Sequence, residues 1–360
     1  MPKILFIAAH RLNRSPSQRF RFEQYFSFLN RNGYECHLSY LLPEADDRIF
    51  YSEGNFIRKV SVVAKSFLRR RKDISKAKEY DIIFIQREAF MTGSVYFEKQ
   101  LKKTGKKIIF DFDDAVWLPN VSEGNRKYEW LKNPSKTSRL ISLADLVIAG
   151  NAFLADYANK FNKNVQVIPT TIDTDYHKRK DHVKQDERIC IGWTGSHTTI
   201  RHFEHAIPVL KKLKEKFGDK IYFKVIGDNA FQNKELCIKG TSWKLENEIT
   251  ELTELDIGIM PLPDDEWTKG KCGLKGLQYM ALEIPTVMSR VGVNNAIISD
   301  GVNGFLAGNE SEWIEKISLL IENPEARKKI GTEARKTVEG NYSVNSRKEN
   351  YLAALKSLLS

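Results

Sequence analysis

The sequence predicts an α/β protein with two doubly wound parallel sheets. Short apolar runs alternate with segments of helical periodicity, and this alternation occurs in two successive blocks of the chain. A length of 360 residues also suits two domains of ordinary size. Because the polar stretch 171–187 separates the blocks, we expect one domain over 1–175, a second over 176–342, and a last helix, 343–360, that returns to the first.

The first block contains six runs that are apolar on both faces, which is typical of buried parallel strands. They are residues 3–10, 36–42, 81–86, 106–114, 146–151 and 165–170. Residues 17–31 place apolar side chains such as Tyr25 and Leu29 at helical spacing, and Gly33 follows as a helix stop. This order predicts a strand–helix–strand unit at the start of the chain.

The second block continues the same alternation. Strands are expected at 188–196, 221–228, 256–262, 285–289 and 304–308, with helices near 201–216, 245–255, 274–282, 310–321, 324–338 and 344–359. Ligands of doubly wound sheets bind beyond the carboxyl ends of the strands. We therefore expect functional residues in the loops that follow these strands.

The composition indicates a folded, cytoplasmic protein. Hydrophobic residues make up 41% of the chain and charged residues 29%, and four widely spaced cysteines disfavour a disulfide framework and a zinc site. No apolar run reaches the ~20 residues that span a bilayer, and no cleavage signal follows the apolar residues 2–9. The net charge of +11 predicts an anionic partner.

A lysine- and glycine-rich segment leads into the helix expected at 274–282. Lys269, Lys271 and Lys275 alternate there with three glycines. Backbone N–H groups and the helix dipole attract anions at a helix start, and lysines add full charges. The segment predicts an anion site, with a solvated basic loop as the alternative. Neither G-x-G-x-x-G nor G-x-x-x-x-G-K-[ST] follows an expected strand, which disfavours dehydrogenases and P-loop enzymes.

Three consecutive motifs resemble the donor-binding half of family 4 glycosyltransferases (glycosyl transferases group 1): DIGIMPL, GKCGLKGLQYMALEIPTVMS and VGVNNAIISDGVNGFLAG. The resemblance covers most of residues 188–342, and VIPTTIDTDYH and DFDDAVW are similar to further segments of this group. It implies a retaining GT-B enzyme, in which two Rossmann-like domains face a cleft. A nucleotide-sugar donor would bind the second domain and the acceptor the first, without a metal or other cofactor.

The same resemblance implies where the donor binds. Lys271 and Lys275 would hold the diphosphate, and Gln278 would accept a ribose hydroxyl. The family usually carries two glutamates eight positions apart, but Gly270 and Gln278 occupy these positions here. The other expected donor-binding residues are Trp193, Gly195, Ser196, Gly227, Cys272 and Gly273. An ordinary helix cap is the alternative for Ser196, and a structural turn is the alternative for Gly227.

Three aspartates, Asp111, Asp113 and Asp114, end a strand of the first domain. A D-x-D string would suggest a metal–diphosphate site, but that usage belongs to a different glycosyltransferase fold. The resemblance implies instead that Asp113 or Asp114 holds a sugar or acceptor hydroxyl, and both are catalytic candidates together with Lys275. The acceptor-side candidates are Arg19, Arg21, Gln86, Arg87 and Asn151. Histidines such as His202 show no metal-ligand spacing and are expected in the core or on the surface.

Residues 56–72, FIRKVSVVAKSFLRRRK, form a basic amphipathic segment without an acidic residue. The apolar stripe of this helix would consist of Ile57, Val60, Ala64 and Leu68. Such a helix can lie on an anionic membrane, with the arginines at 69–71 among its charges. The alternative is that the stripe packs on the first sheet while the charges are merely solvated.

These observations together predict a hexosyltransferase that transfers a sugar to a glycan or lipid-linked acceptor in surface polysaccharide or glycoconjugate assembly, with a peripheral contact to the inner face of the membrane. Two alternatives stay open. An epimerase or phosphorylase could use the same fold. Gly270 and Gln278 also fit a nucleotide-sugar-binding protein without transferase activity. Nucleic-acid binding is disfavoured because the basic residues are spread without an aromatic patch.

Overall fold

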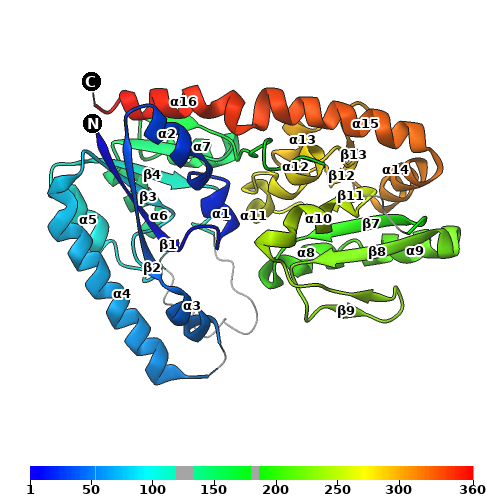
Figure 1. The fold of residues 1–360 in the computed structure, drawn as a ribbon, viewed down its shortest axis with the longest axis horizontal. Helices are drawn as coiled ribbons and strands as arrows, with labels where there is room; N and C mark the ends of the chain where they lie inside the picture. Colours follow the sequence, from blue (N-terminus) through cyan, green and yellow to red (C-terminus); the bar gives the residue numbers. More distant parts are fainter. Residues whose placement is uncertain (53, 119–132, 134, 180–185, 360) are drawn as a thin grey trace. The chain divides into compact units, whose positions relative to one another are not determined.

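The computed structural model describes residues 1–52, 54–118, 133, 135–179 and 186–359. The chain divides into two compact units, Met1–Thr170 with Lys348–Ser360, and Thr171–Arg347 (Figure 1). The division falls five residues before the expected boundary at 175. The chain returns to the first unit at Lys348, which lies within the last helix, α16 (Val344–Lys356), and not at its start. Part of the polar stretch 171–187, namely 180–185, lies outside the described residues.

The first unit contains a parallel sheet of six strands in the order β2-β1-β3-β4-β5-β6. The strands are β1 (Lys3–His10), β2 (Glu35–Leu42), β3 (Ile82–Gln86), β4 (Lys107–Phe112), β5 (Leu146–Ala149) and β6 (Val165–Val167). In the pairing of β3 with β4, Gln86 lies opposite Asp111. The register therefore brings the polar residues that follow these two strands to the same edge of the sheet.

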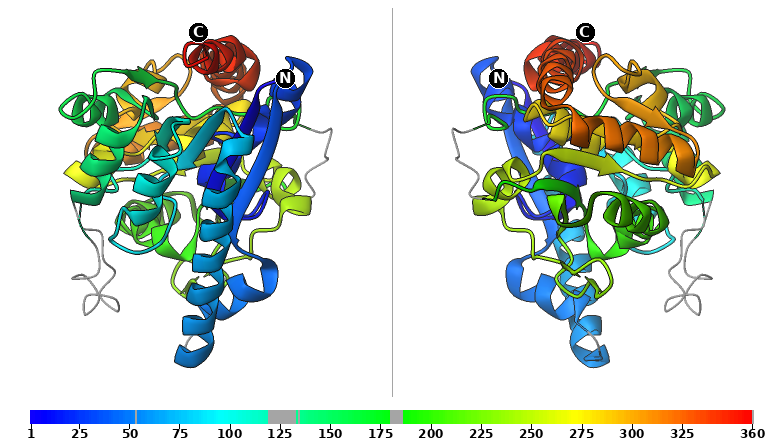
Figure 2. Two further views of the ribbon diagram at one scale, coloured as in Figure 1. Left: turned by 90° about the vertical axis from the view of Figure 1, so that its left-hand side faces the viewer. Right: turned by 90° about the vertical axis from the view of Figure 1, so that its right-hand side faces the viewer.

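Helices cover both faces of this sheet. The helices of the unit are α1 (Pro16–Arg19), α2 (Phe26–Arg31), α3 (Glu44–Tyr51), α4 (Phe56–Lys76), α5 (Tyr96–Lys102), α6 (Ser135–Leu143), α7 (Ala152–Ala158) and the end of α16. On one face, Tyr351 of α16 stacks on Tyr25, and Phe22 stacks on Phe6 of β1. On the other face, α4, α5 and α6 pack in a row (Figures 1 and 2).

Helix α4 turns its apolar stripe away from the sheet. Ile57, Val60 and Leu68 are exposed, whereas Val62 and Ser66 on the opposite side are buried. The alternative that the stripe packs on the first sheet is therefore wrong. The inward face of α4 instead donates hydrogen bonds to backbone carbonyl oxygens of the sheet. The largest buried side chain on this face is an arginine.

That arginine, Arg70, is completely buried and does not belong to a solvated basic face. Its guanidinium donates to the carbonyl oxygens of Ala8 and Ala89, at 2.6 Å each, and to Oδ2 of Asp73 at 2.8 Å. A buried cation is tolerated only where its donors are used. The strand-end carbonyls and one carboxylate provide this compensation, which a periodicity argument cannot foresee.

The second unit contains a parallel sheet of five strands in the order β13-β12-β11-β7-β8. The strands are β7 (Ile189–Thr194), β8 (Ile221–Ile226), β11 (Ile257–Met260), β12 (Thr286–Ser289) and β13 (Phe305–Ala307). A short antiparallel hairpin, β9 (Gln232–Asn233) and β10 (Ile238–Lys239), follows β8 and was not expected from the sequence. All five expected strands of this block are present.

Helices also cover both faces of the second sheet. They are α8 (Ile200–Glu204), α9 (Ile207–Phe217), α10 (Glu248–Thr253), α11 (Glu266–Lys269), α12 (Leu274–Ala281), α13 (Asn294–Ile297), α14 (Glu310–Glu322) and α15 (Pro324–Thr337). The single helix expected near 201–216 is divided in two. Pro208 lies in the first turn of α9, where its missing N–H is tolerated, and this position favours a new helix start. No helix in the described part of the chain is long and apolar enough to cross a membrane.

Candidate functional site

The start of α12 lies at the carboxyl edge of the second sheet, and glycines allow it to approach closely. Gly273, the cap of the helix, has a φ of 72°, and a Cβ there would lie 2.3 Å from Cδ1 of Ile297. At Gly276 a Cβ would lie 1.7 Å from Cε of Met288. A side chain at either position would therefore force Ile297 or Met288 to move.

Two lysines flank this helix start, each over an aromatic ring. Nζ of Lys271 lies 5.1 Å from the centre of the Trp267 ring, and Nζ of Lys275 lies 5.5 Å from the centre of the Trp193 ring. Trp193 is itself completely buried at the end of β7. Cation–π contacts orient both ammonium groups, which the sequence predicts to hold a diphosphate. The structure therefore brings Trp193, Lys271 and Lys275 together at one edge.

The turn after β7 is packed against the turn after β8. The Gly195 N–H donates to the Ile226 carbonyl oxygen at 2.9 Å. A Cβ at Gly227, whose φ is 108°, would lie 1.7 Å from the Gly195 carbonyl oxygen. The structural-turn alternative therefore accounts for Gly227, and contact of either glycine with a donor stays a prediction.

Ser196 takes part in a helix cap. Its backbone N–H donates to Oγ1 of Thr199 at 2.9 Å, and its hydroxyl lies 3.0 Å from that of Thr198. The capping alternative is confirmed. Ser196 is exposed, and its contact with a phosphate stays a prediction.

Gln278 lies beside a carboxylate that sequence reasoning missed. Its side-chain amide donates to Oε1 of Glu248 at 3.2 Å, and the indole N–H of Trp243 donates to the same oxygen at 3.1 Å. Nε2 of His177 lies 3.9 Å from the other oxygen, Oε2. Glu248 comes from α10, far from Gln278 in the sequence, so no local motif could have revealed it. The contact of Gln278 with a ribose stays a prediction.

His202, expected in the core or on the surface, is buried, and its place near the two lysines was not foreseen. It is 4% exposed, and burial lowers its pKa to about 3, with further lowering from the charges of Lys271 and Lys275. Its Nδ1 atom has no hydrogen-bond partner among the described residues. The imidazole is therefore neutral at pH 7 and lies within the electrostatic field of both lysines.

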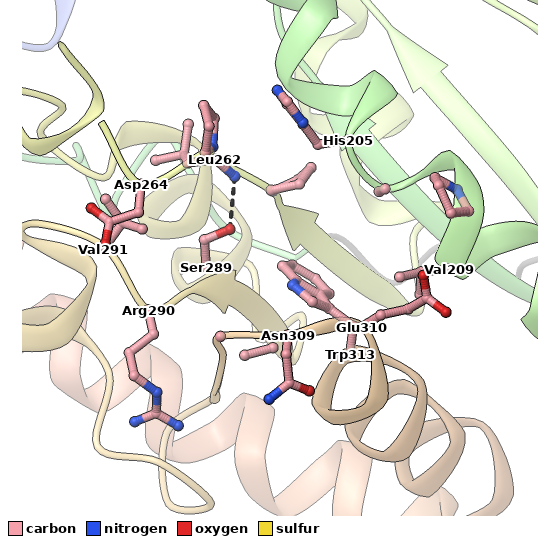
Figure 3. Close-up of a pocket in the computed structure, with 16 residues that line it drawn as sticks. His205, Val209, Leu262, Asp264, Ser289, Arg290, Val291, Asn309, Glu310 and Trp313 are labelled. Atoms are coloured by element: carbon pink, nitrogen blue, oxygen red, sulfur yellow. Dashed lines mark hydrogen bonds between the residues drawn. The ribbon is translucent and has the colours of Figure 1, made fainter. Parts of the chain in front are cut away.

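A pocket of about 460 Å³ opens at the carboxyl ends of β11, β12 and β13 (Figure 3). Its wall includes His205, Leu262, Asn309 and Trp313. The Leu262 N–H donates to the Ser289 hydroxyl at 2.7 Å, which joins two of its loops. None of the donor-binding residues expected from the sequence lines it. Its wall is contributed by four separate segments, and this explains why no single motif predicts it.

In the first unit, Arg87 brings together the residues that follow β3 and β4. Its Nε atom lies 2.8 Å from Oδ1 of Asp113, and Nη2 lies 3.6 Å from Oδ2 of Asp114. The backbone of Arg87 has a φ of 61°, a value that residues other than glycine rarely adopt. Such strain is concentrated at functional sites, so this group is the acceptor-side candidate that the geometry favours most.

The other acceptor-side candidates have structural contacts. Arg21 is buried and donates to Asp111 at 2.5 Å and to the Ile168 carbonyl oxygen at 2.6 Å. Asn151 caps α7 by accepting from the Leu154 N–H at 2.9 Å. These two residues therefore have structural roles that were not foreseen, and their contact with an acceptor stays a prediction.

The remaining two candidates also contact protein groups. The side-chain amide of Gln86, a buried residue, lies 3.4 Å from the Ser17 carbonyl oxygen. The guanidinium carbon of Arg19 lies 4.8 Å from the centre of the Phe20 ring. Their predicted role toward an acceptor is likewise untested.

Residues 188–323, which form most of the second unit, match the family described as Glycosyl transferases group 1. A curated relative, the trehalose synthase of Pyrococcus horikoshii, is 35% identical over 86 residues, which are 24% of this chain. The chain covers 21% of the length of that relative.

Solved glycosyltransferase structures share the fold along the entire chain. The structure of Anabaena Alr3699/HepE in complex with UDP and glucose has a TM-score of 0.70 at 15% identity and covers 99% of this chain and 100% of its own. A glycosyltransferase from Rickettsia africae has a TM-score of 0.69 at 15% identity, and the match covers 100% of this chain and 99% of that structure's chain. Sucrose-phosphate synthase from Thermosynechococcus elongatus has a TM-score of 0.70 at 12% identity, and the match covers 100% of both chains. The predicted GT-B fold class is confirmed.

Proposed function

We propose that the protein is a glycosyltransferase that takes a sugar from a nucleotide-sugar and transfers it to a glycan or lipid-linked acceptor. The observation that carries this proposal is the pair Lys271 and Lys275 at the start of α12, within the segment that matches the family Glycosyl transferases group 1. Two oriented cations and a helix N-terminus suit a diphosphate leaving group.

The chemistry proposed for this site is stabilisation of the departing diphosphate. As the bond between the sugar and the diphosphate breaks, negative charge grows on the bridging oxygen. Lys271 and Lys275 stabilise that charge. The neutral imidazole of His202 can donate a hydrogen bond, and because it is uncharged it does not repel the two lysines. Lys275 is the catalytic candidate of this group because it projects from the helix itself.

The remainder of the donor has a proposed place as well. Gln278 and the neighbouring carboxylate of Glu248 offer hydrogen-bond acceptors to ribose hydroxyls. Glu248 would then compensate in part for the absence of a glutamate at 278. Since UDP and glucose are bound in the Anabaena structure, a UDP-sugar is the first donor to test.

In the first unit, Asp113 and Asp114 are proposed to bind a hydroxyl of the acceptor or of the sugar. Arg87 orients Asp113 through a charge-assisted hydrogen bond. We propose that transfer occurs with retention, without a metal or other cofactor, in surface polysaccharide or glycoconjugate assembly. We also propose that the protein works in the cytoplasm, at the inner face of a membrane.

Product analysis tests this function. Purified protein is incubated with UDP-sugars, with and without candidate acceptors, and released UDP is measured together with the glycosylated product. Release of UDP only when an acceptor is present supports transfer. If the protein binds a UDP-sugar but releases no UDP with any of the acceptors tested, the result favours a nucleotide-sugar-binding protein without transferase activity. Conversion of one UDP-sugar into another without acceptor would favour the epimerase.

A further inference from the structure

One face of α4 carries large apolar side chains that are more than half exposed to solvent. Phe56 is 79% exposed, Ile57 85%, Val60 52% and Leu68 63%. At 100° per residue, Ile57, Val60 and Leu68 lie on one side of the helix, opposite the buried Val62 and Ser66. One end of α4, beside α3, extends beyond the strands of its sheet (Figures 1 and 2). Within the described part of the first unit, this exposed apolar stripe takes no part in the packing.

Positive charge borders the stripe. Segment 56–72 contains no acidic residue, and its exposed cations include Arg58 beside Ile57 and the pair Arg71 and Lys72 about one turn after Leu68. Three further cations of the helix are used within the unit. Lys65 and Arg69 pair with Asp46, at 3.2 and 3.0 Å, and Arg70 is buried.

The combination of an apolar stripe and bordering cations selects one class of partner. A second copy of the same face would bring like charges together. A nucleic acid would use the cations but leave the apolar side chains in water. An anionic bilayer takes both, because apolar side chains enter the headgroup–acyl boundary while lysine and arginine contact the headgroups.

We propose that this face of α4, formed by Phe56, Ile57, Val60 and Leu68 with Arg58, Arg71 and Lys72, docks the protein on an anionic lipid bilayer. The docking is peripheral. It does not rest on the transfer reaction, since a nucleotide-sugar-binding protein with this helix would dock in the same way.

Two variants of the full chain separate the contributions of charge and apolar surface. The charge variant combines Arg58→Gln, Arg71→Gln and Lys72→Gln, and its control removes three exposed lysines elsewhere, Lys220→Gln, Lys328→Gln and Lys329→Gln. The apolar variant combines Ile57→Ser and Leu68→Ser, and its control combines Val302→Ser and Leu319→Ser, which are also exposed. None of these residues belongs to the candidate sites described above.

Co-sedimentation with phosphatidylcholine vesicles, with and without phosphatidylglycerol, measures the docking. We expect the wild type to bind only the anionic vesicles, and binding to fall as salt rises. The charge variant should bind about a hundredfold more weakly, and the apolar variant at least tenfold more weakly. Both control variants should bind like the wild type.

Several results would overturn the proposal. If the wild type and both α4 variants sediment equally with anionic vesicles, α4 does not contact the bilayer. If the wild type instead self-associates without vesicles, and Ile57→Ser with Leu68→Ser abolishes this, the face is an interface between copies. Calorimetric titration with UDP accompanies each variant. Unchanged UDP affinity shows that a loss of docking leaves the proposed donor site intact.

Discussion

The Nε atom of Arg87 lies 2.8 Å from Oδ1 of Asp113, across the carboxyl ends of the neighbouring strands β3 and β4. Arg87 holds this position with a φ of 61°, which costs a residue with a Cβ on the order of 1 kcal/mol. The protein thus keeps an arginine at a backbone conformation that favours glycine. We interpret this as a requirement for the guanidinium.

The strain at Arg87 can be measured by comparing two substitutions. Arg87→Gly and Arg87→Ala both remove the ion pair with Asp113, but only glycine relieves the left-handed backbone. We expect Arg87→Gly to be about 1 kcal/mol more stable than Arg87→Ala in urea unfolding, and both to lose transfer activity. Equal stability of the two variants would show that the backbone at this position is not strained.

Asp113→Asn tests the acceptor-side role. The amide keeps the shape of the side chain but loses the charge that makes hydrogen bonds to hydroxyls strong, so turnover should fall at least tenfold. Affinity for UDP, measured by calorimetry, should not change, because the donor residues belong to the other unit. Asp156→Asn, a change at an exposed aspartate of α7, serves as the control. A parallel loss of UDP affinity in Asp113→Asn would argue against this division of roles.

Lys275→Ala should weaken the binding of UDP by roughly tenfold to a hundredfold, because it removes a cation that we propose contacts the diphosphate. Lys271→Ala should have a smaller effect, and Lys220→Ala, an exposed lysine of the same unit, none. Calorimetric titration with UDP gives all three values. Unchanged affinity in both Lys275→Ala and Lys271→Ala would move the phosphate site elsewhere.

Turnover should not depend on a divalent metal. The lysines and the start of α12 provide the positive field at the proposed diphosphate site, and Asp113 is engaged by Arg87. We expect full activity after treatment with a chelator. Loss of activity that magnesium or manganese restores would show that a metal takes part and that the DFDD segment was misinterpreted.

Stability should fall as the pH is lowered from about 6.5 toward 4, partly because of His10. Burial is the largest cause of the lowering of its pKa from 6.5 to about 4, and the side chain is 16% exposed. Between these values the unfolded chain binds a proton that the folded chain excludes, so acid favours unfolding.

His10→Gln tests this effect, since it removes the titrating group. The free energy of unfolding of the wild type, relative to the variant, should decrease by up to about 3 kcal/mol between pH 7 and pH 4. Urea titrations of both proteins across this range give the difference. A constant difference across the range would show that His10 does not titrate with a lowered pKa.

The strands were the most predictable part of the fold. β3, expected at 81–86, spans Ile82–Gln86, because apolar residues on both faces identify a buried parallel strand. The division of one expected helix at Pro208 follows a local rule that was available in the sequence. The hairpin β9–β10 was not predictable from periodicity, since strands of two residues carry no repeat.

The candidate site was predictable where it is local in sequence. Lys271, Gly273 and Lys275 fall within five residues, and a glycine-marked helix start indicates an anion site. Glu248 and His202 reach the same unit's site residues from other helices, and only tertiary contacts show their roles. The opposite error occurred at Arg70, where a charged residue in a basic run was assigned to the surface although strand-end carbonyls hold it in the core.

The contacts of Arg70 have a mechanical consequence. Its guanidinium joins α4 to Ala8, two residues before the end of β1, and to Ala89, two residues beyond Arg87. A helix fastened in this way cannot tilt without disturbing the loop that contains Arg87, and through its ion pair also Asp113. If α4 docks on lipid, it does so as part of the first unit's rigid frame. The edge that carries Asp113, where we propose that a hydroxyl binds, would then stand at a constant height above the bilayer. Only acceptors presented at that height would be glycosylated.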